Sequence, residues 1–414
     1  MNEPKLRFKA DGEIPFPDWE KKELSDICEL ITVGIANSAT QAYRDTGVIM
    51  FRNQNIKENY LDTSDLIYID PEFEKRYKKK RLKADDLLIV RTGYPGTACL
   101  VPPEYEDAQT FTTLIARLIK NENVPAYVCQ YINSPLGKSY FESTQIGGGQ
   151  KNSGAKILEN FPISLPSLPE QQKIAFLFTE LDTIIQSAEK ELEGYRELKQ
   201  GMLQKMFPKK GEKVPEIRFP EFTGDWEQHK LGEVAPLRGG YAFKSDKYKT
   251  EGTPIVRISN ILSDGSVGAE FAYYDDIEDD EKCTLGNGDA LLAMSGATTG
   301  KVSILKCNNN DKYYQNQRVG YFERNEQYNY GFVSTIVRSD LFKEQLTLVL
   351  VAGAQPNVSS KEIDAFEFMF PNSIVEQKKI GEYFSNLDNL IALQQQELDG
   401  YKELKKGLLQ QMFC

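Results

Sequence analysis

The organisation of this chain follows from one stretch, Glu191-Leu192-Glu193-Gly194-Tyr195-Arg196-Glu197-Leu198-Lys199. The same pattern returns 206 positions later as Glu397-Leu398-Asp399-Gly400-Tyr401-Lys402-Glu403-Leu404-Lys405. Around these stretches, residues 170–207 and 376–413 align without a gap and share 20 identities in 38 positions. Average composition would produce roughly two or three identities by chance. The chain therefore contains an internal repeat.

The repeat extends into the rest of the chain. The only two tryptophans, Trp19 and Trp226, stand at equivalent places, and each is followed by Glu. The regions between the repeated segments are much less alike than the segments themselves, which favours one scaffold with two different specificities over neutral drift of loops. We expect the order domain, long helix, domain, long helix, with limits at residues 1–168, 169–208, 209–374 and 375–414.

Apolar residues in both repeated segments recur at alternating spacings of three and four, which is the pattern of a coiled coil. A helix of about 36 residues spans roughly 54 Å and cannot cover its own apolar stripe. We expect the two helices to form an antiparallel intramolecular coiled coil. The alternatives are packing of each helix on its own domain and pairing between chains. The predicted core positions are Ile174, Leu177, Leu181, Ile184, Tyr195, Leu198, Ile380, Leu387, Leu390, Tyr401 and Leu404.

Each globular half has roughly 160 residues, the usual size of one domain. The short apolar runs 87–90 and 290–293 predict buried strands, whereas residues 127–133 and 332–346 predict helices. The fold class that follows is α+β, with two tandem strand-rich domains separated by the two long helices.

The composition is that of an ordinary soluble protein, with 40% hydrophobic and 27% charged residues. No apolar run approaches the ~18 residues of a membrane span. The six cysteines are scattered without a C-x-x-C pair, which favours a reducing compartment, the cytoplasm, and argues against a metal site. A net charge of -11 excludes a protein that coats nucleic acid by bulk charge, so DNA binding would depend on local features.

One such feature is the basic segment 75–81, in which six of seven residues are Lys or Arg. In a protein that binds DNA, these side chains would contact phosphates, which set affinity and register. A solvated surface loop is the alternative. The comparable segment of the second half, residues 275–281, is acidic, so the two segments cannot share one role. The candidate phosphate contacts are Lys78, Lys79, Lys80 and Arg81.

Candidate base contacts lie in loops after matched strands and just before the long helices. Amide and guanidinium groups suit the edges of bases in the major groove, although such side chains also cap turns. The candidates are Arg91, Thr92, Tyr94, Gln150, Lys151 and Asn152 in the first half, and Ser295, Thr298, Thr299, Lys301, Gln355 and Asn357 in the second.

Residues for catalysis are not recognisable. His229 is the only histidine. The segment 296–301 is not a phosphate loop, because three residues instead of four separate its glycines and Val302 replaces the Ser or Thr of that motif. We therefore expect no catalytic residue, no metal and no cofactor in this chain. A duplicated layout without catalytic residues favours a recognition protein.

The chain resembles the specificity subunit of type I restriction–modification systems over essentially its whole length. The resemblance includes the first helix start, Pro166-Ser167-Leu168-Pro169-Glu170-Gln171-Gln172-Lys173-Ile174, echoed by Glu376-Gln377-Lys378-Lys379-Ile380. It also includes the repeated helices, the two Trp-Glu segments, and the strands Asp86-Leu87-Leu88-Ile89 and Gly288-Asp289-Ala290-Leu291-Leu292. The duplicated set is specific, whereas the Glu-Gln pair alone would be weak.

The resemblance implies that each half is a target recognition domain for one part of a split double-stranded DNA sequence. The helices would set the gap between the two parts. Modification subunits that carry the methyl donor and methylate adenine, two for each specificity subunit, would dock on this scaffold. Restriction subunits would add ATP-dependent cleavage. The chain itself would be non-catalytic and would contain neither methyl donor nor ATP.

Three alternatives remain at this point. In the first alternative, the chain is the specificity subunit of a related system, in which the partner is a fused methyltransferase–nuclease. A stand-alone nuclease or methyltransferase would bind its own cofactor. A coiled-coil scaffold without a role in DNA binding would not distinguish cognate from scrambled DNA.

Overall fold

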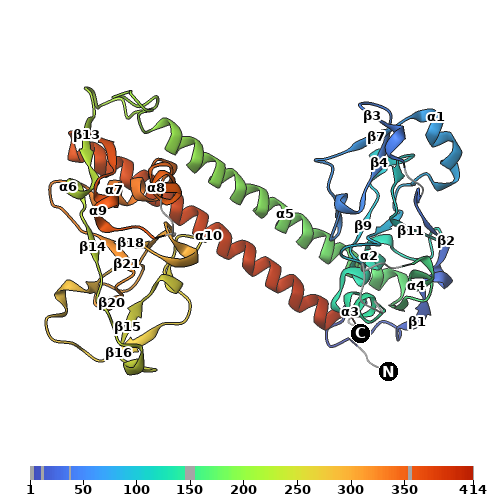
Figure 1. Ribbon diagram of the computed structural model, residues 1–414. Coiled ribbons are helices and arrows are strands. Elements are labelled where there is room, and N and C mark those ends of the chain that lie inside the picture. The colour runs from blue at the N-terminus through green and yellow to red at the C-terminus, as the bar shows by residue number, and fades with distance from the viewer. Residues whose placement is uncertain (1–3, 11–13, 37–38, 145–153, 353–356, 414) are drawn as a thin grey trace. The chain divides into compact units, whose positions relative to one another are not determined.

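The computed structural model describes residues 4–10, 14–36, 39–144, 154–352 and 357–413. The chain divides into two compact units, and Figure 1 labels many of their elements. Unit 1 consists of Met1–Lys190 and Gln395–Cys414, and unit 2 consists of Glu191–Gln394. This division cuts both long helices near their middle, so each unit contains one globular domain and a segment of each long helix.

Unit 1 contains short strands around four helices and the first part of α5. Its strands are β1 (Glu20–Glu23), β2 (Cys28–Val33), β3 (Tyr43–Arg44), β4 (Val48–Phe51), β5 (Ile56–Lys57), β6 (Tyr60–Leu61), β7 (Ile67–Ile69), β8 (Leu87–Ile89), β9 (Ala98–Leu100), β10 (Gln109–Thr110), β11 (Leu114–Leu118) and β12 (Pro162–Leu165). Its helices are α1 (Pro71–Glu74), α2 (Pro125–Asn133), α3 (Pro135–Ser143), α4 (Ala155–Glu159) and the start of α5 (Leu168–Lys205).

Unit 2 repeats this order with fewer small strands. Its strands are β13 (Glu227–Lys230), β14 (Leu237–Gly239), β15 (Thr253–Val256), β16 (Ala272–Tyr274), β17 (Thr284–Leu285), β18 (Ala290–Ala293), β19 (Val302–Ile304), β20 (Tyr313–Gln315), β21 (Val319–Phe322) and β22 (Glu367–Phe370). Its helices are α6 (Leu231–Val234), α7 (Tyr330–Val337), α8 (Asp340–Ala352), α9 (Ser360–Asp364) and the start of α10 (Ile374–Met412).

The central sheets of the two units correspond strand by strand. The order β2-β11-β8-β9 in unit 1 matches β14-β21-β18-β19 in unit 2. The pairs β1-β12 and β13-β22 match as well, and in each unit one parallel pair, β4-β10 or β15-β20, forms part of the second four-stranded sheet. The two halves therefore share one topology, which confirms the α+β prediction.

The buried strands β8 and β18 explain the continuous apolar runs of the sequence. Leu87 and Ile89 of β8 belong to one core cluster, whereas Leu88 between them belongs to another. The strand β18 divides its side chains between two clusters in the same way. Because successive side chains point to opposite faces, a strand with a core on each face must be apolar at every position.

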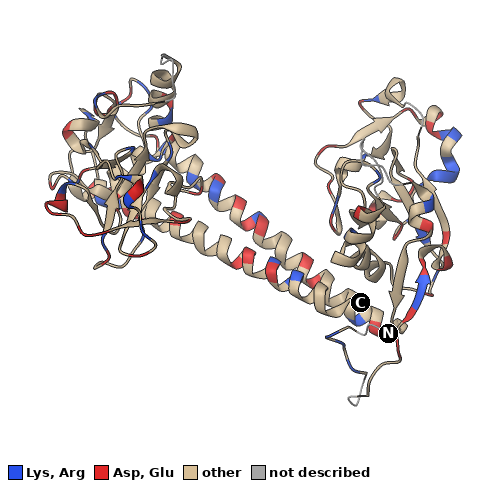
Figure 2. Cartoon of the chain, turned by 60° about the horizontal axis from the view of Figure 1, so that its bottom comes forward, with Lys and Arg blue, Asp and Glu red and all other residues tan. Residues whose placement is uncertain are grey.

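The long helices lie antiparallel within each unit. In unit 1, Lys402 Nζ lies 2.6 Å from Glu189 Oε1, and Lys405 forms an ion pair with Asp182. In unit 2, Lys199 Nζ lies 2.5 Å from Asp388 Oδ1. Residues late in one helix thus contact residues early in the other. Charged residues of both signs are interspersed along both helices (Figure 2).

The apolar seam differs from the predicted one. Ile174, Leu181, Ile380 and Leu387 are buried, and Leu177, Tyr195 and Tyr401 are half-buried. Four predicted core residues are exposed, so their assignment was wrong: Ile184, Leu198, Leu390 and Leu404. The seam instead uses the flanking stripe of Phe178, Ile185 and Leu192 together with the positions 174, 181 and 188.

The reason for the shifted seam is the packing of the helix ends on the domains. Phe178 stacks on Phe413 with ring centroids 5.7 Å apart, inside the core of unit 1. In unit 2, Phe207 and Phe384 lie in the domain core, 6.1 Å apart. With these aromatic contacts in place, the 178–185–192 stripe of α5 faces inward, and so do Phe384 and Leu398 of α10. Each helix therefore packs both on its partner helix and on a globular domain.

The helix predicted over 332–346 is two helices, α7 and α8. The hydroxyl of Ser339, between them, donates a 2.7 Å bond to the carbonyl of Ile336. The equivalent Ser134, between α2 and α3, donates a 2.7 Å bond to the carbonyl of Tyr131. The break is a feature of the repeat, because in both units the hydroxyl of the serine between the two helices bonds to the carbonyl three residues earlier.

Each long helix is tied to a domain at its first turn by the Glu-Gln pair. Glu170 is fully buried and accepts bonds of 3.0 and 2.8 Å from Arg7, and Glu376 accepts bonds of 2.7 and 2.9 Å from Arg218. The next residue, Gln171 or Gln377, accepts a bond from the backbone N–H at the start of α2 or α7. We call these Arg–Glu pairs the helix-start clamps. They give the repeated Glu-Gln a structural role.

Candidate nucleic-acid interface

The candidate interface in unit 1 is the place where β8 ends and β11 begins. The side chain of Asn53 joins the segments there. Its Oδ1 accepts bonds from the Arg91 N–H (3.3 Å) and the Thr113 hydroxyl (3.4 Å), and its Nδ2 donates to the Thr92 hydroxyl (2.9 Å). Tyr94, in the same loop, is 84% exposed. We call residues 53, 91–94 and 111–113 the strand-end surface of unit 1.

Unit 2 brings the equivalent segments together with backbone bonds. The Met294 N–H donates to the carbonyl of Arg318 (3.0 Å), and the Val358 N–H donates to the carbonyl of Met294 (3.0 Å). The Gln317 N–H donates to the carbonyl of Tyr241 (2.8 Å). The strand-end surface of unit 2 therefore comprises residues 241, 294–299, 316–318, 357 and 358.

The same framework carries different side chains in the two units. The strands β8 and β18 pair antiparallel with β11 and β21, with Ile89 opposite Leu114 and its counterpart Leu292 opposite Gly320. The sequence repeat aligns Arg91 with Met294.

Several predicted candidates lie on these surfaces. Arg91, Thr92 and Tyr94 occupy the β8–β9 loop, and Ser295, Thr298 and Thr299 occupy the β18–β19 loop. The Thr298 hydroxyl donates to the carbonyl of Ile258 (3.2 Å), and the Thr299 hydroxyl donates to that of Gly296 (2.7 Å).

The remaining loop candidates have different outcomes. Lys301 donates from Nζ to the Ser263 hydroxyl at 2.6 Å. Asn357 is exposed beside Val358. Gln150, Lys151, Asn152 and Gln355 lie outside the described residues.

The basic segment 75–81 divides into structural and exposed cations. Lys80 Nζ donates to the carbonyls of Val33 (2.7 Å) and Gly34 (2.9 Å). Arg81 donates two 2.7 Å bonds to the buried Glu74. These two charges hold the segment to unit 1, and their assignment as phosphate contacts stays a prediction. Lys78 and Lys79 are exposed.

The aspartates before the buried strands are structural as well. Asp86 accepts the backbone N–H of Lys83 at 2.8 Å and two 2.7 Å bonds from Arg117. Asp289 accepts the N–H of Gly286 at 2.8 Å and a 2.9 Å bond from Arg324. Each aspartate closes the turn that leads into its strand, so the repeated Asp marks a turn and not a catalytic acid.

Sequence reasoning missed Asn53, Tyr241, Gln317 and Arg318. Asn53 lies between Arg52 and Asn55, which match Arg257 and Asn260 of the second half, so the repeat marked its neighbourhood. Gln317 and Arg318 had no such signal, because the halves do not align visibly there. Only the turn between β20 and β21, together with the pairing of β21 with β18, places them beside the β18–β19 loop.

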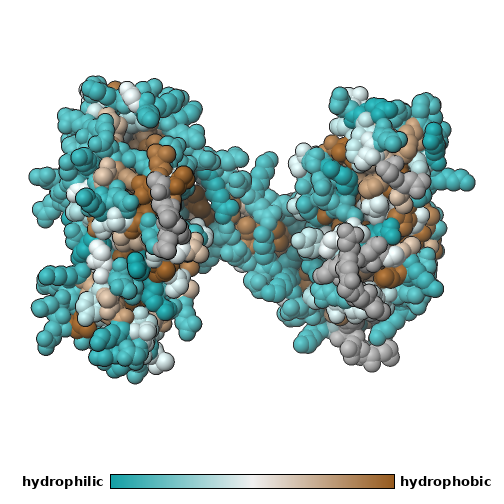
Figure 3. All heavy atoms as spheres, in the orientation of Figure 1, coloured by the Kyte–Doolittle hydropathy of each residue, from teal (hydrophilic) through white to brown (hydrophobic). Residues whose placement is uncertain are grey.

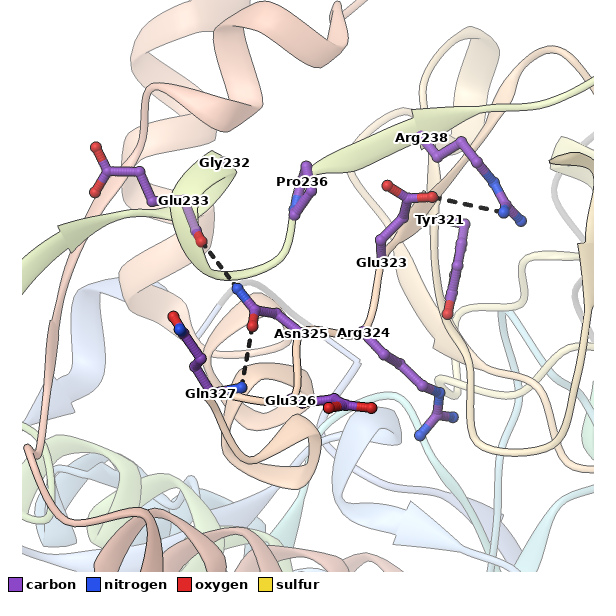
Figure 4. Close-up of a pocket in the computed structure, with 10 residues that line it drawn as sticks. All are labelled: Gly232, Glu233, Pro236, Arg238, Tyr321, Glu323, Arg324, Asn325, Glu326 and Gln327. Carbon is purple, nitrogen blue, oxygen red and sulfur yellow. Dashed lines mark hydrogen bonds and ion pairs between the residues drawn. The ribbon is translucent and has the colours of Figure 1, made fainter.

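A hollow of unit 2, shown in Figure 4, has polar walls whose charges are largely paired within the protein. Arg238 lies 3.6 Å from Glu323, and the Asn325 amide donates to the carbonyl of Glu233 at 3.2 Å. Arg324, which also lines it, is bonded to Asp289. We therefore assign no ligand to this hollow.

Other chemical groups have little reactivity. Burial raises the pKa of the Cys28 thiol to about 12 and also raises the pKa of the Cys99 and Cys129 thiols, so these groups are poor nucleophiles at neutral pH. In the described ranges, no group of three or more His, Cys, Asp or Glu side chains could hold a metal ion. Among the described helices, none has the length and apolar content needed to cross a bilayer.

Comparison with known proteins identifies the family. The family of the type I restriction modification DNA specificity domain matches twice, at residues 17–194 and 223–402. The MjaVIII specificity subunit of Methanocaldococcus jannaschii, a type I restriction enzyme subunit, is 30% identical over 286 residues, which cover 66% of each chain. A putative MjaX specificity subunit of the same organism is 24% identical over 425 residues, 96% of this chain and 93% of that protein.

Solved structures show the same fold. The S subunit of a type I restriction–modification system from M. genitalium superimposes with a TM-score of 0.68 at 13% identity, over 100% of this chain and 99% of that one. A chain from a study of complex assembly in the type I R-M system gives a TM-score of 0.50 at 15% identity, over 96% and 98%. Because the family model matches two domains that share one topology, the chain belongs to the type I restriction–modification DNA specificity family. It is the non-catalytic subunit that recognises DNA sequence.

Proposed function

We propose that each half recognises one part of a split DNA target and that the two long helices set the gap between the parts. The observation that carries the proposal is the pairing of one framework with two sets of side chains. Sheet order and helix-start clamps repeat in both units, whereas the strand-end surfaces differ. A duplicated framework with divergent surfaces fits two recognition domains with different sequence preferences.

The helices suit the role of a spacer, because each of them contributes residues to both units. The helix α5 contributes its first part to unit 1 and residues 191–205 to unit 2, and α10 does the reverse. A helix of 38 residues is roughly 57 Å long at 1.5 Å per residue. Two such helices, paired along the seam, resist bending more than a flexible linker would.

We further propose that two modification subunits dock on the outer apolar residues of the helices. Ile184 (41% exposed) and Leu404 (51%) belong to unit 1, and Leu198 (46%) and Leu390 (45%) belong to unit 2. The repeat relates Ile184 to Leu390 and Leu198 to Leu404, so each unit presents the same pair. Figure 3 shows hydrophobic residues among hydrophilic ones on the helical segments. Two equivalent patches suit two copies of one partner.

In this proposal the partners supply the chemistry. Modification subunits carry the methyl donor, and restriction subunits add ATP-dependent cleavage of double-stranded DNA. The complex acts in the cytoplasm. A fused methyltransferase–nuclease is the alternative partner, and the size of the subunit that co-purifies decides between them.

The central test is a methylation map. The full chain is co-expressed with the modification subunit, and methylated adenines are located on genomic DNA by single-molecule sequencing. We expect a split motif with a fixed gap, both parts of which are needed for methylation. A continuous motif would mean that one half alone recognises DNA. Absence of any motif, despite a stable complex, would favour a scaffold without a role in recognition.

The docking proposal has its own test. Ile184→Arg or Leu198→Arg alone should reduce the complex to one bound modification subunit, and the double variant should bind none. Light scattering after size exclusion gives the stoichiometry. The control is Gln186→Arg, an exposed position on the first helix that faces away from Ile184. Unchanged stoichiometry in the double variant would refute these patches as docking sites.

A further inference from the structure

The turn between β20 and β21, which joins the two four-stranded sheets of unit 2, presents two polar side chains on a rigid backbone. The Asn316 N–H donates to the carbonyl of Val256 (3.1 Å), and the Gln317 N–H donates to that of Tyr241 (2.8 Å). The carbonyl of Arg318 accepts the Met294 N–H at 3.0 Å. Framework bonds thus hold the turn from several sides, while the side chains of Gln317 and Arg318 are exposed.

Arg318 differs from the other arginines of unit 2. Arg196, Arg218, Arg238, Arg324 and Arg338 each lie within ion-pair distance of a carboxylate. Arg257 donates to the carbonyl of Glu270. Within the described part of the chain, the guanidinium of Arg318 has no hydrogen-bond or ion-pair partner. In a chain of net charge -11, such an exposed guanidinium is available to an external acceptor.

The turn has no counterpart of the same chemistry in unit 1. The pairing of β10 with β4 and of β20 with β15 places Thr112 at the position of Gln317. The pairing of β11 with β8 and of β21 with β18 places Thr113 at the position of Val319, so Arg318 has no counterpart in unit 1. Thr113 is fully buried, and its hydroxyl bonds to Asn53 and to the carbonyl of Phe111. The Gln-Arg pair is therefore particular to the second half.

The neighbours of the turn fit a base-contacting surface. Tyr241 is 51% exposed beside it, and the exposed Asn357 precedes Val358, whose N–H bonds to Met294. Arginine bonds to guanine O6 and N7 through two N–H groups, and glutamine bonds to adenine N6 and N7.

We propose that Arg318 recognises a guanine in the major groove of the half-site bound by unit 2, and that Gln317 contacts the adjacent base pair. This inference deepens the proposed function, because it rests on unit 2 binding one part of a split DNA target. It assigns the specificity of that part to a turn and not to the β18–β19 loop alone.

The experiment uses the full chain in complex with its modification subunit. Methylation maps are recorded for the parent protein and for Arg318→Ala, Arg318→Lys and Gln317→Ala. We expect Arg318→Ala to relax one guanine position in one part of the motif, while the other part and the gap stay unchanged. Gln317→Ala should relax a neighbouring position. Affinity for the cognate duplex should fall about 5- to 100-fold for Arg318→Ala, and affinity for scrambled DNA should change much less.

Arg318→Lys separates base recognition from phosphate contact. Lysine keeps the charge but cannot form the bidentate bond, so the lysine variant should relax the same guanine as the alanine variant. A uniform loss on all sequences, restored by lysine, would mean a phosphate contact and overturn the proposal. An unchanged motif, or relaxation of the other half-site, would overturn it as well.

Two controls complete the design. Lys306→Ala removes another exposed cation of unit 2 and should leave the motif intact. Because the substituted side chains are exposed, we expect the variants to melt at the same temperature as the parent protein. Equal melting temperatures exclude misfolding as the cause of a changed motif. Failure of the proposed function is a separate result: the parent protein itself would then give no split motif.

Discussion

At the helix-start clamps the two units use the same side chains for the same bonds, whereas at the strand-end surfaces they use different ones. Both clamps join a buried glutamate to an arginine through two hydrogen bonds. The strand-end surfaces hold Asn53, Arg91 and Thr113 in unit 1 against Met294 and Arg318 in unit 2. The shared framework therefore stabilises the fold of both units, whereas the side chains at the strand ends can differ and so change the DNA sequence that each unit recognises.

The largest expected effect comes from breaking one clamp. Glu170→Gln or Glu376→Gln leaves a largely buried arginine without its charge partner, which should cost about 3 kcal/mol of unfolding free energy. Urea denaturation of both variants measures the loss. Similar losses at both sites would support equivalent clamps, and a loss below ~1 kcal/mol at either would break the comparison. Glu193→Gln, at an exposed site of α5, is the control.

A matched pair of leucines tests the corrected seam. Leu192 is 3% exposed and Leu198 is 46% exposed on the same helix. Leu192→Ala should lower the free energy of unfolding by about 2–3 kcal/mol, and Leu198→Ala by less than ~1 kcal/mol. Thermal or urea unfolding gives the difference. Equal losses of unfolding free energy would instead support the stripe predicted from the sequence, in which Leu198 is a core residue. Leu398→Ala and Leu404→Ala repeat the comparison on α10.

The ion pairs of Asp388 with Arg338 and Lys199 predict that the pH dependence of stability differs between the two halves. Burial alone would raise the pKa of the Asp388 carboxyl, but the charges of Arg338 and Lys199 outweigh burial and lower that pKa. The ionised carboxylate therefore stabilises the fold above the ordinary pKa of about 3.9, and this stability is lost as pH falls through the lower folded pKa.

Asp388→Asn should cost about 2 kcal/mol at pH 7. The gap between variant and parent should close as pH falls below about 4. Denaturation from pH 7 to pH 3 measures it, and a gap independent of pH would contradict the argument. Asp182→Asn should lose less, because Asp182 contacts one cation, Lys405, and the amide of Gln130.

The smallest effect is expected at the basic segment. Lys78→Ala with Lys79→Ala should weaken binding of cognate and scrambled DNA alike by a few fold and reduce the salt dependence by up to ~2 logarithmic units per tenfold salt. Fluorescence anisotropy at several salt concentrations gives both values. A change of motif instead would make this segment part of the base-recognition surface. No matching effect is expected in unit 2, whose corresponding segment is acidic.

Much of the fold was predictable because periodic patterns record burial directly. The runs 87–90 and 290–293 became the central strands β8 and β18, and the repeat located both long helices within a few residues. The seam was mispredicted because two neighbouring stripes, 177–184–198 and 178–185–192, are both apolar. Spacing cannot choose between them, whereas the aromatic contacts of Phe178 and Phe384 with the helix ends do.

The candidate site was predictable only in part. Arg91, Thr92 and Ser295 follow recognisable strands, so their loops could be located from the sequence. Gln317 and Arg318 could not, because their place beside residue 294 depends on the pairing of β21 with β18.

The sequence by itself determined the duplication, the helix positions, the α+β class and the family, because local periodicity and repeated motifs carry that information. Only the tertiary structure decided which apolar stripe is buried, which cations are held by carboxylates and carbonyls, and which side chains meet at the strand ends. These outcomes depend on contacts between residues far apart in the chain, such as Arg7 with Glu170 and Arg318 with Met294. Such contacts leave no periodic trace in a single sequence.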